Sequence, residues 1–200
     1  MDMINLSVPE ISTDLYGAIV AFAEGFPGWL QALALFGTDA GIVLFVVLFL
    51  VNWWLARGGE PRRMALALVG PVAVTGAYLV SEIAKTLIQQ DRPCWGRTVT
   101  MIADCPSPGD YSFPSNHATI AAASAGVLAI VWRVTRFVVI PLAVGMAFSR
   151  VFVGVHYPHD VMVGFIIGIV VAPVLLLLLV GAVTPVIKVM RGKEVLRSLI

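Results

Sequence analysis

The chain has 200 residues and a net charge of +1, and 59% of its residues are hydrophobic while only 12% are charged. Soluble domains carry about 25% charged residues, so this composition excludes an ordinary soluble domain and predicts one integral membrane domain, residues 1–200. The near-zero charge and the lack of a basic run argue against nucleic acid as a partner, which leaves membrane lipids as the expected surroundings.

The first part of the chain, about residues 10–36, has a weak membrane pattern. "ISTDLYGAIVAFAE" has apolar residues at helical spacing, but Asp14 and Glu24 interrupt it and "GFPGW" breaks it. We expect helices that lie in the interface or cap the bundle; a sixth span is the alternative. The residues before this region contain no lysine or arginine, which is not the pattern of a cleavable signal peptide.

Five later segments are apolar enough to cross a bilayer core of about 30 Å, which takes about 20 residues. They are residues 38–56, 64–84, 117–132, 136–153 and 160–187. The sequence therefore predicts an all-α fold, a polytopic transmembrane bundle of about five to six membrane helices.

The basic residues predict the orientation of this bundle in the plasma membrane. With five spans, two loops and the C-terminal region lie on one face, and they contain nine basic residues: Arg57, Arg62, Arg63, Arg133, Arg136, Lys188, Arg191, Lys193 and Arg197. The positive-inside rule makes that face and the C-terminus cytoplasmic. The loop of about residues 85–116, which also contains Arg97, and the segment 149–160 then lie on the extracytoplasmic side.

The two cysteines, Cys94 and Cys105, both fall in the 85–116 loop. An oxidising compartment favours their pairing, so we expect a disulfide; two unrelated thiols are the alternative.

Polar residues gather in three clusters at the ends of apolar helices. In the first, "KTLIQQDRP", Lys85 and Arg92 are seven residues apart, about two helical turns, so both point to one side if the helix runs to Pro93. The alternative is that both cations extend toward lipid headgroups.

The second cluster is "FPSNH". Ser115 or Asn116 suits a helix N-cap, and the free backbone N–H groups of a helix start bind anions well. A simple cap is the alternative. His117 stands at the mouth of a membrane helix, where ionisable groups are usually functional.

The third cluster is "SRVFVGVHYPHD". Ser149 and Arg150 end one span, and Asp160 lies in the first turn of the next, within reach of His156. A carboxylate on one ring nitrogen fixes the tautomer and leaves the other nitrogen as an acceptor or nucleophile. His159 points about 100° away from Asp160 on a helix, so we expect it to be a bystander.

His156, His159 and Asp160 could also imitate a metal site. The clusters, however, supply three cations that repel a divalent metal and attract a tetrahedral dianion: Lys85, Arg92 and Arg150. The charge balance predicts a phosphate site with no metal and no cofactor.

Together the clusters resemble the signature of the membrane-embedded phosphatidic acid phosphatase type 2 superfamily, the lipid phosphate phosphatases. Its pattern is Lys, six residues, Arg-Pro; Pro-Ser-Gly-His; and Ser-Arg, five residues, His, three residues, Asp. Asn116 replaces the usual glycine. In this replacement, in its small size and in its "FPS-x-H" and "HYP-x-D" motifs, the chain resembles the bacitracin-resistance-type polyprenyl diphosphate phosphatases.

The resemblance implies a metal-free reaction. His156 would attack phosphorus, Asp160 would orient it, and His117 would protonate the leaving oxygen and then activate water. The phosphate would be held by Lys85, Arg92, Ser115, Asn116 and Arg150. A polyprenyl diphosphate is the expected substrate. The alternatives are phosphatidic acid or phosphatidylglycerol phosphate, a non-catalytic binder or transporter of lipid phosphates, and a metal-dependent membrane hydrolase.

Overall fold

The computed structural model describes residues 8–95 and 101–192, which leaves the predicted positions of Arg97, Lys193 and Arg197 outside the described residues. It consists of helices α1 (Glu10–Glu24), α2 (Gly28–Ala56), α3 (Pro61–Ile88), α4 (Asn116–Val131), the 3-10 helix η1 (Arg133–Thr135), α5 (Arg136–Phe152) and α6 (Pro158–Met190). Within these described ranges there is no β-strand. The all-helical prediction is confirmed.

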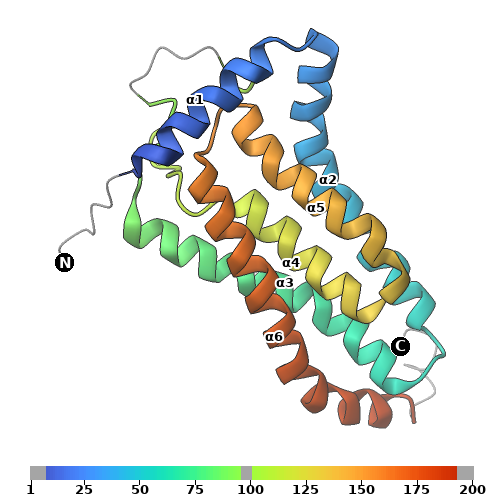
Figure 1. Cartoon of the computed structure of the whole chain (residues 1–200). Coiled ribbons are helices and arrows are strands. Elements are labelled where there is room, and N and C mark those ends of the chain that lie inside the picture. The colour runs from blue at the N-terminus through green and yellow to red at the C-terminus, as the bar shows by residue number, and fades with distance from the viewer. Residues whose placement is uncertain (1–7, 96–100, 193–200) are drawn as a thin grey trace.

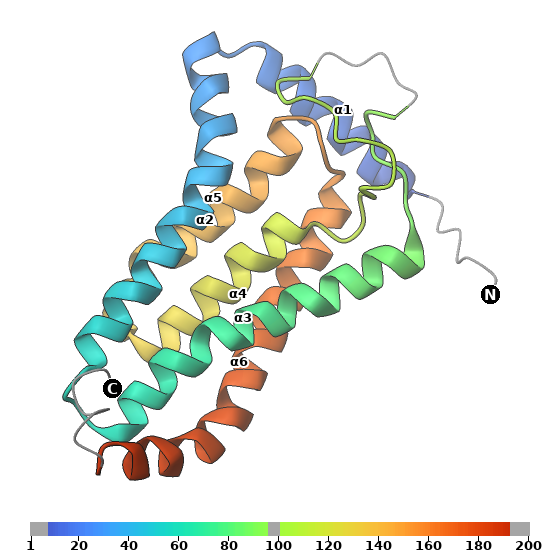
Figure 2. The ribbon, with the colours of Figure 1, turned by 180° about the vertical axis from the view of Figure 1, so that it is seen from behind.

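The helices form a multi-pass membrane bundle around α4. Helices α2, α3 and α6, and α5 taken together with η1, are long and apolar enough to cross a membrane. The 16 residues of α4 span only about 24 Å. This helix lies between α3, α5 and α6 in both views (Figure 1 and Figure 2), and its run from Ala121 to Leu128 is buried throughout. All five predicted spans lie in bundle helices.

Glycines on α6 set the close approach of α6 to α4. A Cβ atom on Gly168 would lie 2.3 Å from the carbonyl oxygen of Thr119, and one on Gly164 would lie 2.4 Å from that of Ser115. Small residues four apart allow such close crossings between membrane helices. The crossing brings the first turn of α6 against the start of α4, and with it the second and third polar clusters.

The prediction for the N-terminal region is half right. Helix α1 crosses one end of the bundle (Figure 1), as expected for a cap, and the Tyr16 hydroxyl donates to the carbonyl of Gly154 at 2.9 Å. Residues 28–36, in contrast, are the first turns of the membrane helix α2. The predicted break at "GFPGW" lies where α1 ends and α2 begins, but the span predicted to start at residue 38 belongs to a helix that runs without interruption from Gly28.

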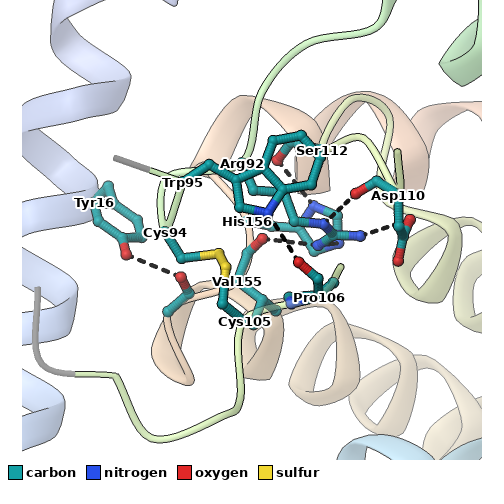
Figure 3. The surroundings of a disulfide bond; sticks show 11 residues. Tyr16, Arg92, Cys94, Trp95, Cys105, Pro106, Asp110, Ser112, Val155 and His156 are labelled. Atoms are coloured by element: carbon teal, nitrogen blue, oxygen red, sulfur yellow. Dashed lines mark hydrogen bonds and ion pairs between the residues drawn. A yellow bond between two sulfur atoms is a disulfide. The ribbon is translucent and has the colours of Figure 1, made fainter. Parts of the chain in front are cut away.

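The end of the bundle beneath α1 carries residues 89–95, 101–115 and 153–157, and we call it the loop end. Cys94 and Cys105 form a disulfide there, with Cα atoms 5.9 Å apart (Figure 3). Beside it the indole N–H of Trp95 donates to the carbonyl of Pro106 at 2.8 Å. The described basic residues of the predicted cytoplasmic face lie at the opposite end, where α2 joins α3, α4 joins α5, and α6 ends.

Candidate active site

Lys85 and Arg92 of the first cluster lie close together, but not because of the helical spacing that was predicted. Helix α3 ends at Ile88, where Gln89 adopts a left-handed conformation with φ 52°, so Arg92 is not on the helix. The chain turns back over the loop end instead. There Lys85 Nζ lies 3.2 Å and Arg92 Nη2 2.9 Å from the same oxygen, Oδ1 of Asp110. The two cations meet through this carboxylate rather than through helical spacing.

Asp110 therefore joins the cations that were predicted to bind phosphate. Its side chain is 50% exposed, whereas those of Lys85 and Arg92 are almost fully buried. Burial favours the protonated acid, but the charges of Arg92 and Lys85 outweigh it and hold the pKa of Asp110 below its usual value. Arg92 is further fixed because its Nε donates to the Asp110 carbonyl at 2.5 Å and its Nη1 to the Val155 carbonyl at 2.9 Å.

The third cluster folds into a tight loop between α5 and α6. Gly154 has φ 92°, a value that side-chain-bearing residues rarely adopt, and the N–H groups of Val155 and His156 both donate to the carbonyl of Arg150. The loop buries His156, which is 1% exposed, with its Nε2 3.2 Å from Arg92 Nη1 (Figure 3). Burial lowers the pKa of His156 to about 3, so its ring is neutral at neutral pH.

A serine stands between His156 and Asp160. His156 Nδ1 lies 3.5 Å from Asp160 Oδ2, a long contact. The hydroxyl of Ser112 donates to the same Asp160 oxygen and lies 3.4 Å from His156 Nδ1. The predicted pair is thus close, and Ser112, which the sequence interpretation missed, connects it.

The second cluster begins α4. Ser115 is the N-cap, but its side chain makes no capping hydrogen bond. Its buried Oγ has no hydrogen-bond partner among the described residues, and neither has the buried Nε of Arg150. Two buried polar groups in this state are unusual, because an unpaired buried polar atom normally costs about 1–3 kcal/mol.

His117 and Asn116 point to neighbouring helices. His117 Nε2 lies 3.3 Å from Oδ1 of Asp39, a residue of α2 that is 77% exposed. The Asn116 amide donates to Glu82 of α3 at 2.5 Å and accepts from Ser81 at 2.8 Å. Asp39 was missed, although an ionisable residue inside an apolar helix is itself a functional signal.

The three predicted clusters thus lie together at the loop end. Arg92 contacts His156, Ser112 links His156 to Asp160, and the backbone N–H of Ser115 donates to the carbonyl of Asp160 at 3.0 Å. In the described ranges no three His, Cys, Asp or Glu residues are grouped so as to hold a metal ion. The arrangement offers a neutral imidazole beside fixed cations.

A family model and several known proteins match this chain. The family model described as the PAP2 superfamily matches residues 63–183. The undecaprenyl-diphosphatase of Sulfolobus acidocaldarius is 34% identical over 108 residues, which cover 54% of this chain and 51% of that protein. The undecaprenyl-diphosphatase BcrC of Bacillus subtilis is 32% identical over 146 residues, 71% of each chain. The matched region thus spans about half of the Sulfolobus protein.

Among solved structures, the PAP2-type phosphatidylglycerolphosphate phosphatase from Bacillus subtilis has the same fold. The TM-score is 0.61 at 22% identity, over 92% of this chain and 90% of that one. At this identity the likeness concerns the fold.

Proposed function

The chain belongs to the PAP2 superfamily, and we propose that it is a lipid phosphatase whose active site is the cluster at the loop end. The observation that carries this proposal is the convergence of Lys85 and Arg92 on one carboxylate oxygen beside a buried neutral histidine. A phosphate oxygen suits the same two cations. The unpaired Ser115 Oγ and Arg150 Nε would be two further donors for it.

The proposed chemistry follows from the surroundings of the two ring nitrogens of His156. Nδ1 faces Ser112 and Asp160, while Nε2 faces Arg92, so Nε2 is the nitrogen available to phosphorus. Nε2 forms a bond to phosphorus as the bond to the leaving oxygen breaks, and His117 gives that oxygen its proton. His117 then takes a proton from water, which cleaves the phosphohistidine and releases inorganic phosphate.

The cations act on the charge that develops in this reaction. Lys85, Arg92 and Arg150 would hold the phosphoryl oxygens, together with Ser115 Oγ and the backbone N–H of Asn116. The Asn116 side chain bonds to α3, so the replacement of the usual glycine leaves that N–H unchanged as a donor. The residues supply every proton transfer, and the proposed reaction therefore needs no metal.

A polyprenyl diphosphate is the substrate we propose, giving the monophosphate and inorganic phosphate. Its support is the pair of relatives named undecaprenyl-diphosphatase. Phosphatidylglycerol phosphate is the second candidate, because the structural neighbour from Bacillus subtilis carries that name. We propose that the loop end faces the extracytoplasmic side, as the basic residues at the other end favour.

The test is phosphate release by the purified protein in detergent from undecaprenyl diphosphate, phosphatidylglycerol phosphate and phosphatidic acid, each with and without exhaustive chelation. We expect the highest kcat/KM with the diphosphate, no effect of chelator, and loss of activity in His156→Ala. Preference for a glycerolipid would overturn the substrate assignment. Activity that is lost on chelation would overturn the metal-free reaction. Activity of His156→Ala would remove the nucleophile, and binding without hydrolysis would make the protein a lipid-phosphate binder.

A further inference from the structure

Asp160 has a second oxygen, Oδ1, that does not face His156. Oδ1 accepts a hydrogen bond from the side-chain amide of Gln90 at 2.9 Å and lies 3.1 Å from Nε2 of His159. His159 Nε2 is also 3.0 Å from the amide oxygen of Gln90. The sequence interpretation of His159 as a bystander is therefore wrong in its geometry, because the ring turns back toward its neighbour on α6.

These contacts are consistent with one placement of protons. The Gln90 amide donates through nitrogen to Asp160, so its oxygen and Asp160 Oδ1 are both acceptors facing His159 Nε2, which must carry a proton. His159 Nδ1 is then free to accept from the hydroxyl of Ser12 at 2.7 Å. The Ser12 oxygen in turn accepts from the backbone N–H of His159 at 3.3 Å.

The network is enclosed by packing as well as by hydrogen bonds. The His159 ring stacks on Phe113 and on Tyr157, with centroid distances of 5.6 and 5.7 Å and an interplanar angle of 27° in each pair. Ser12 and Gln90 are 4% and 7% exposed. Gln90, from the segment after α3, and His159 of α6 contact the carboxylate oxygen, and Ser12 of α1 holds the other ring nitrogen of His159.

We propose that His159, Gln90 and Ser12 are positioning residues that fix the Asp160 carboxylate for the reaction of His156. This inference rests on the proposed function. With Oδ1 held by two donors, Oδ2 stays directed at Ser112 and the His156 ring. Without those donors only Oδ2 is held, by the Ser112 hydroxyl and by the backbone N–H of Tyr157 at 2.8 Å. The carboxylate then has more freedom to turn, and the tautomer and direction of the His156 ring are less firmly fixed. Helix α1 is thereby part of the active-site scaffold.

Two substitutions of His159 separate hydrogen bonding from packing. His159→Phe keeps an aromatic ring between Phe113 and Tyr157 but removes the N–H donor to Asp160. His159→Gln loses the stacked ring but keeps an N–H donor. We expect His159→Phe to lower kcat about tenfold to a hundredfold, the usual effect of losing a group that orients a functional side chain. We expect His159→Gln to recover much of that loss.

The measurements are kcat, KM and the rate of phosphohistidine formation with farnesyl diphosphate, together with the Ki of inorganic phosphate and the thermal unfolding midpoint. KM and Ki should change little, because the cations are untouched. The phosphohistidine should form more slowly in His159→Phe. A fall in folded protein alone would lower the amplitude and leave the rate unchanged, so it would count against positioning.

A milder pair of variants on α1 repeats the test where misfolding is not expected. Ser12→Ala removes the hydroxyl that holds His159 Nδ1, whereas Thr13→Ala, its neighbour, removes an exposed hydroxyl bonded only to the Pro9 carbonyl. We expect Ser12→Ala to lower kcat, and we expect the kcat of Thr13→Ala to equal that of the wild type. Equal activity of these two variants would overturn the role of Ser12, and wild-type kcat in His159→Phe would overturn the whole proposal.

His156→Ala distinguishes failure of this inference from failure of the proposed function. An inactive His156→Ala together with a fully active His159→Phe would leave the phosphatase assignment in place and reject the positioning role. An active His156→Ala would reject the nucleophile itself. An equal loss in His159→Phe and His159→Gln would also reject the positioning role, because the retained donor would have had no effect.

Discussion

The carboxylate of Asp110 contacts Lys85 and Arg92 at the position where we expect a phosphate oxygen. Both Lys85 Nζ and Arg92 Nη2 contact its Oδ1. In the free protein this contact keeps two nearly buried cations aligned. An incoming phosphate must compete with a negative charge that belongs to the protein.

We therefore expect Asp110→Asn to bind inorganic phosphate more tightly. A half-exposed ion pair contributes up to about 1 kcal/mol, so the Ki of phosphate should fall by up to about fivefold. Asp104→Asn is the matched control, because Asp104 lies exposed in the same segment and makes no ion pair in the described part of the chain. A Ki that is unchanged or raised in Asp110→Asn would mean that the carboxylate aligns the cations more than it competes.

His156 carries the strongest pH prediction. Its pKa is lowered to about 3 by burial, despite the opposing effect of Asp160, while the unfolded chain has a histidine pKa near 6.5. Below about pH 6.5 the unfolded chain takes up a proton that the folded protein does not, so this histidine lowers the stability as the pH falls.

Histidine ring NMR on the ¹⁵N-labelled protein measures this directly, because the chain has only three histidines. We expect the His156 signal, assigned by its loss in His156→Asn, to remain that of a neutral ring from pH 7 to pH 5. A titration midpoint near 6.5 would contradict the burial of an uncharged ring against Arg92 and Ser112.

At the scale of helices, the crossing of α4 and α6 positions the segments that carry the candidate site residues. The starts of both helices supply site residues, and the crossing depends on Gly164 and Gly168, where a Cβ would meet backbone atoms of α4. Backbone atoms cannot move aside as flexible side-chain ends do. The helix pair must therefore separate if either glycine acquires a side chain.

Gly164→Ala and Gly168→Ala should each destabilise the protein by about 1–3 kcal/mol, as overpacking usually does. Gly164→Ala should also lower activity, because its Cβ would press on the carbonyl of Ser115. Gly181→Ala on the same helix is the control: its Cβ meets nothing within 4 Å, so the helix preference for alanine should leave stability equal or higher. Thermal unfolding followed by phosphate release measures both effects, and equal behaviour of the three variants would disprove the close crossing.

For the whole molecule, the distribution of charge predicts the orientation. The disulfide occupies the only two cysteines of the chain, so single introduced cysteines report on each face. Ser107 is exposed at the loop end and Glu60 is exposed at the opposite end. In intact cells a membrane-impermeant maleimide should label Ser107→Cys, and it should label Glu60→Cys only after the membrane is permeabilised. The reverse pattern would place the site on the cytoplasmic side.

Much of this molecule was predictable because the relevant signals are local in sequence. The apolar segments matched the bundle helices, since the length of an apolar run decides whether it can cross a bilayer. The spacing of residues within each of the three clusters is visible in the sequence, and the family that this spacing indicated is the one to which the chain belongs. The break at "GFPGW" was predicted, but the span was started at residue 38 because residues 28–37 were grouped with the interrupted pattern before that break.

The sequence by itself determined the helical membrane fold and the family, and it supplied the residues of the candidate site. Only the tertiary structure decided that Asp110 joins the two cations, that Ser112 stands between His156 and Asp160, and that Asp39 contacts His117. It likewise turned His159 from a bystander into a neighbour of Asp160. The physical reason is that the helix crossings and the paths of residues 89–95 and 101–115 bring these residues together, and apolar periodicity specifies neither.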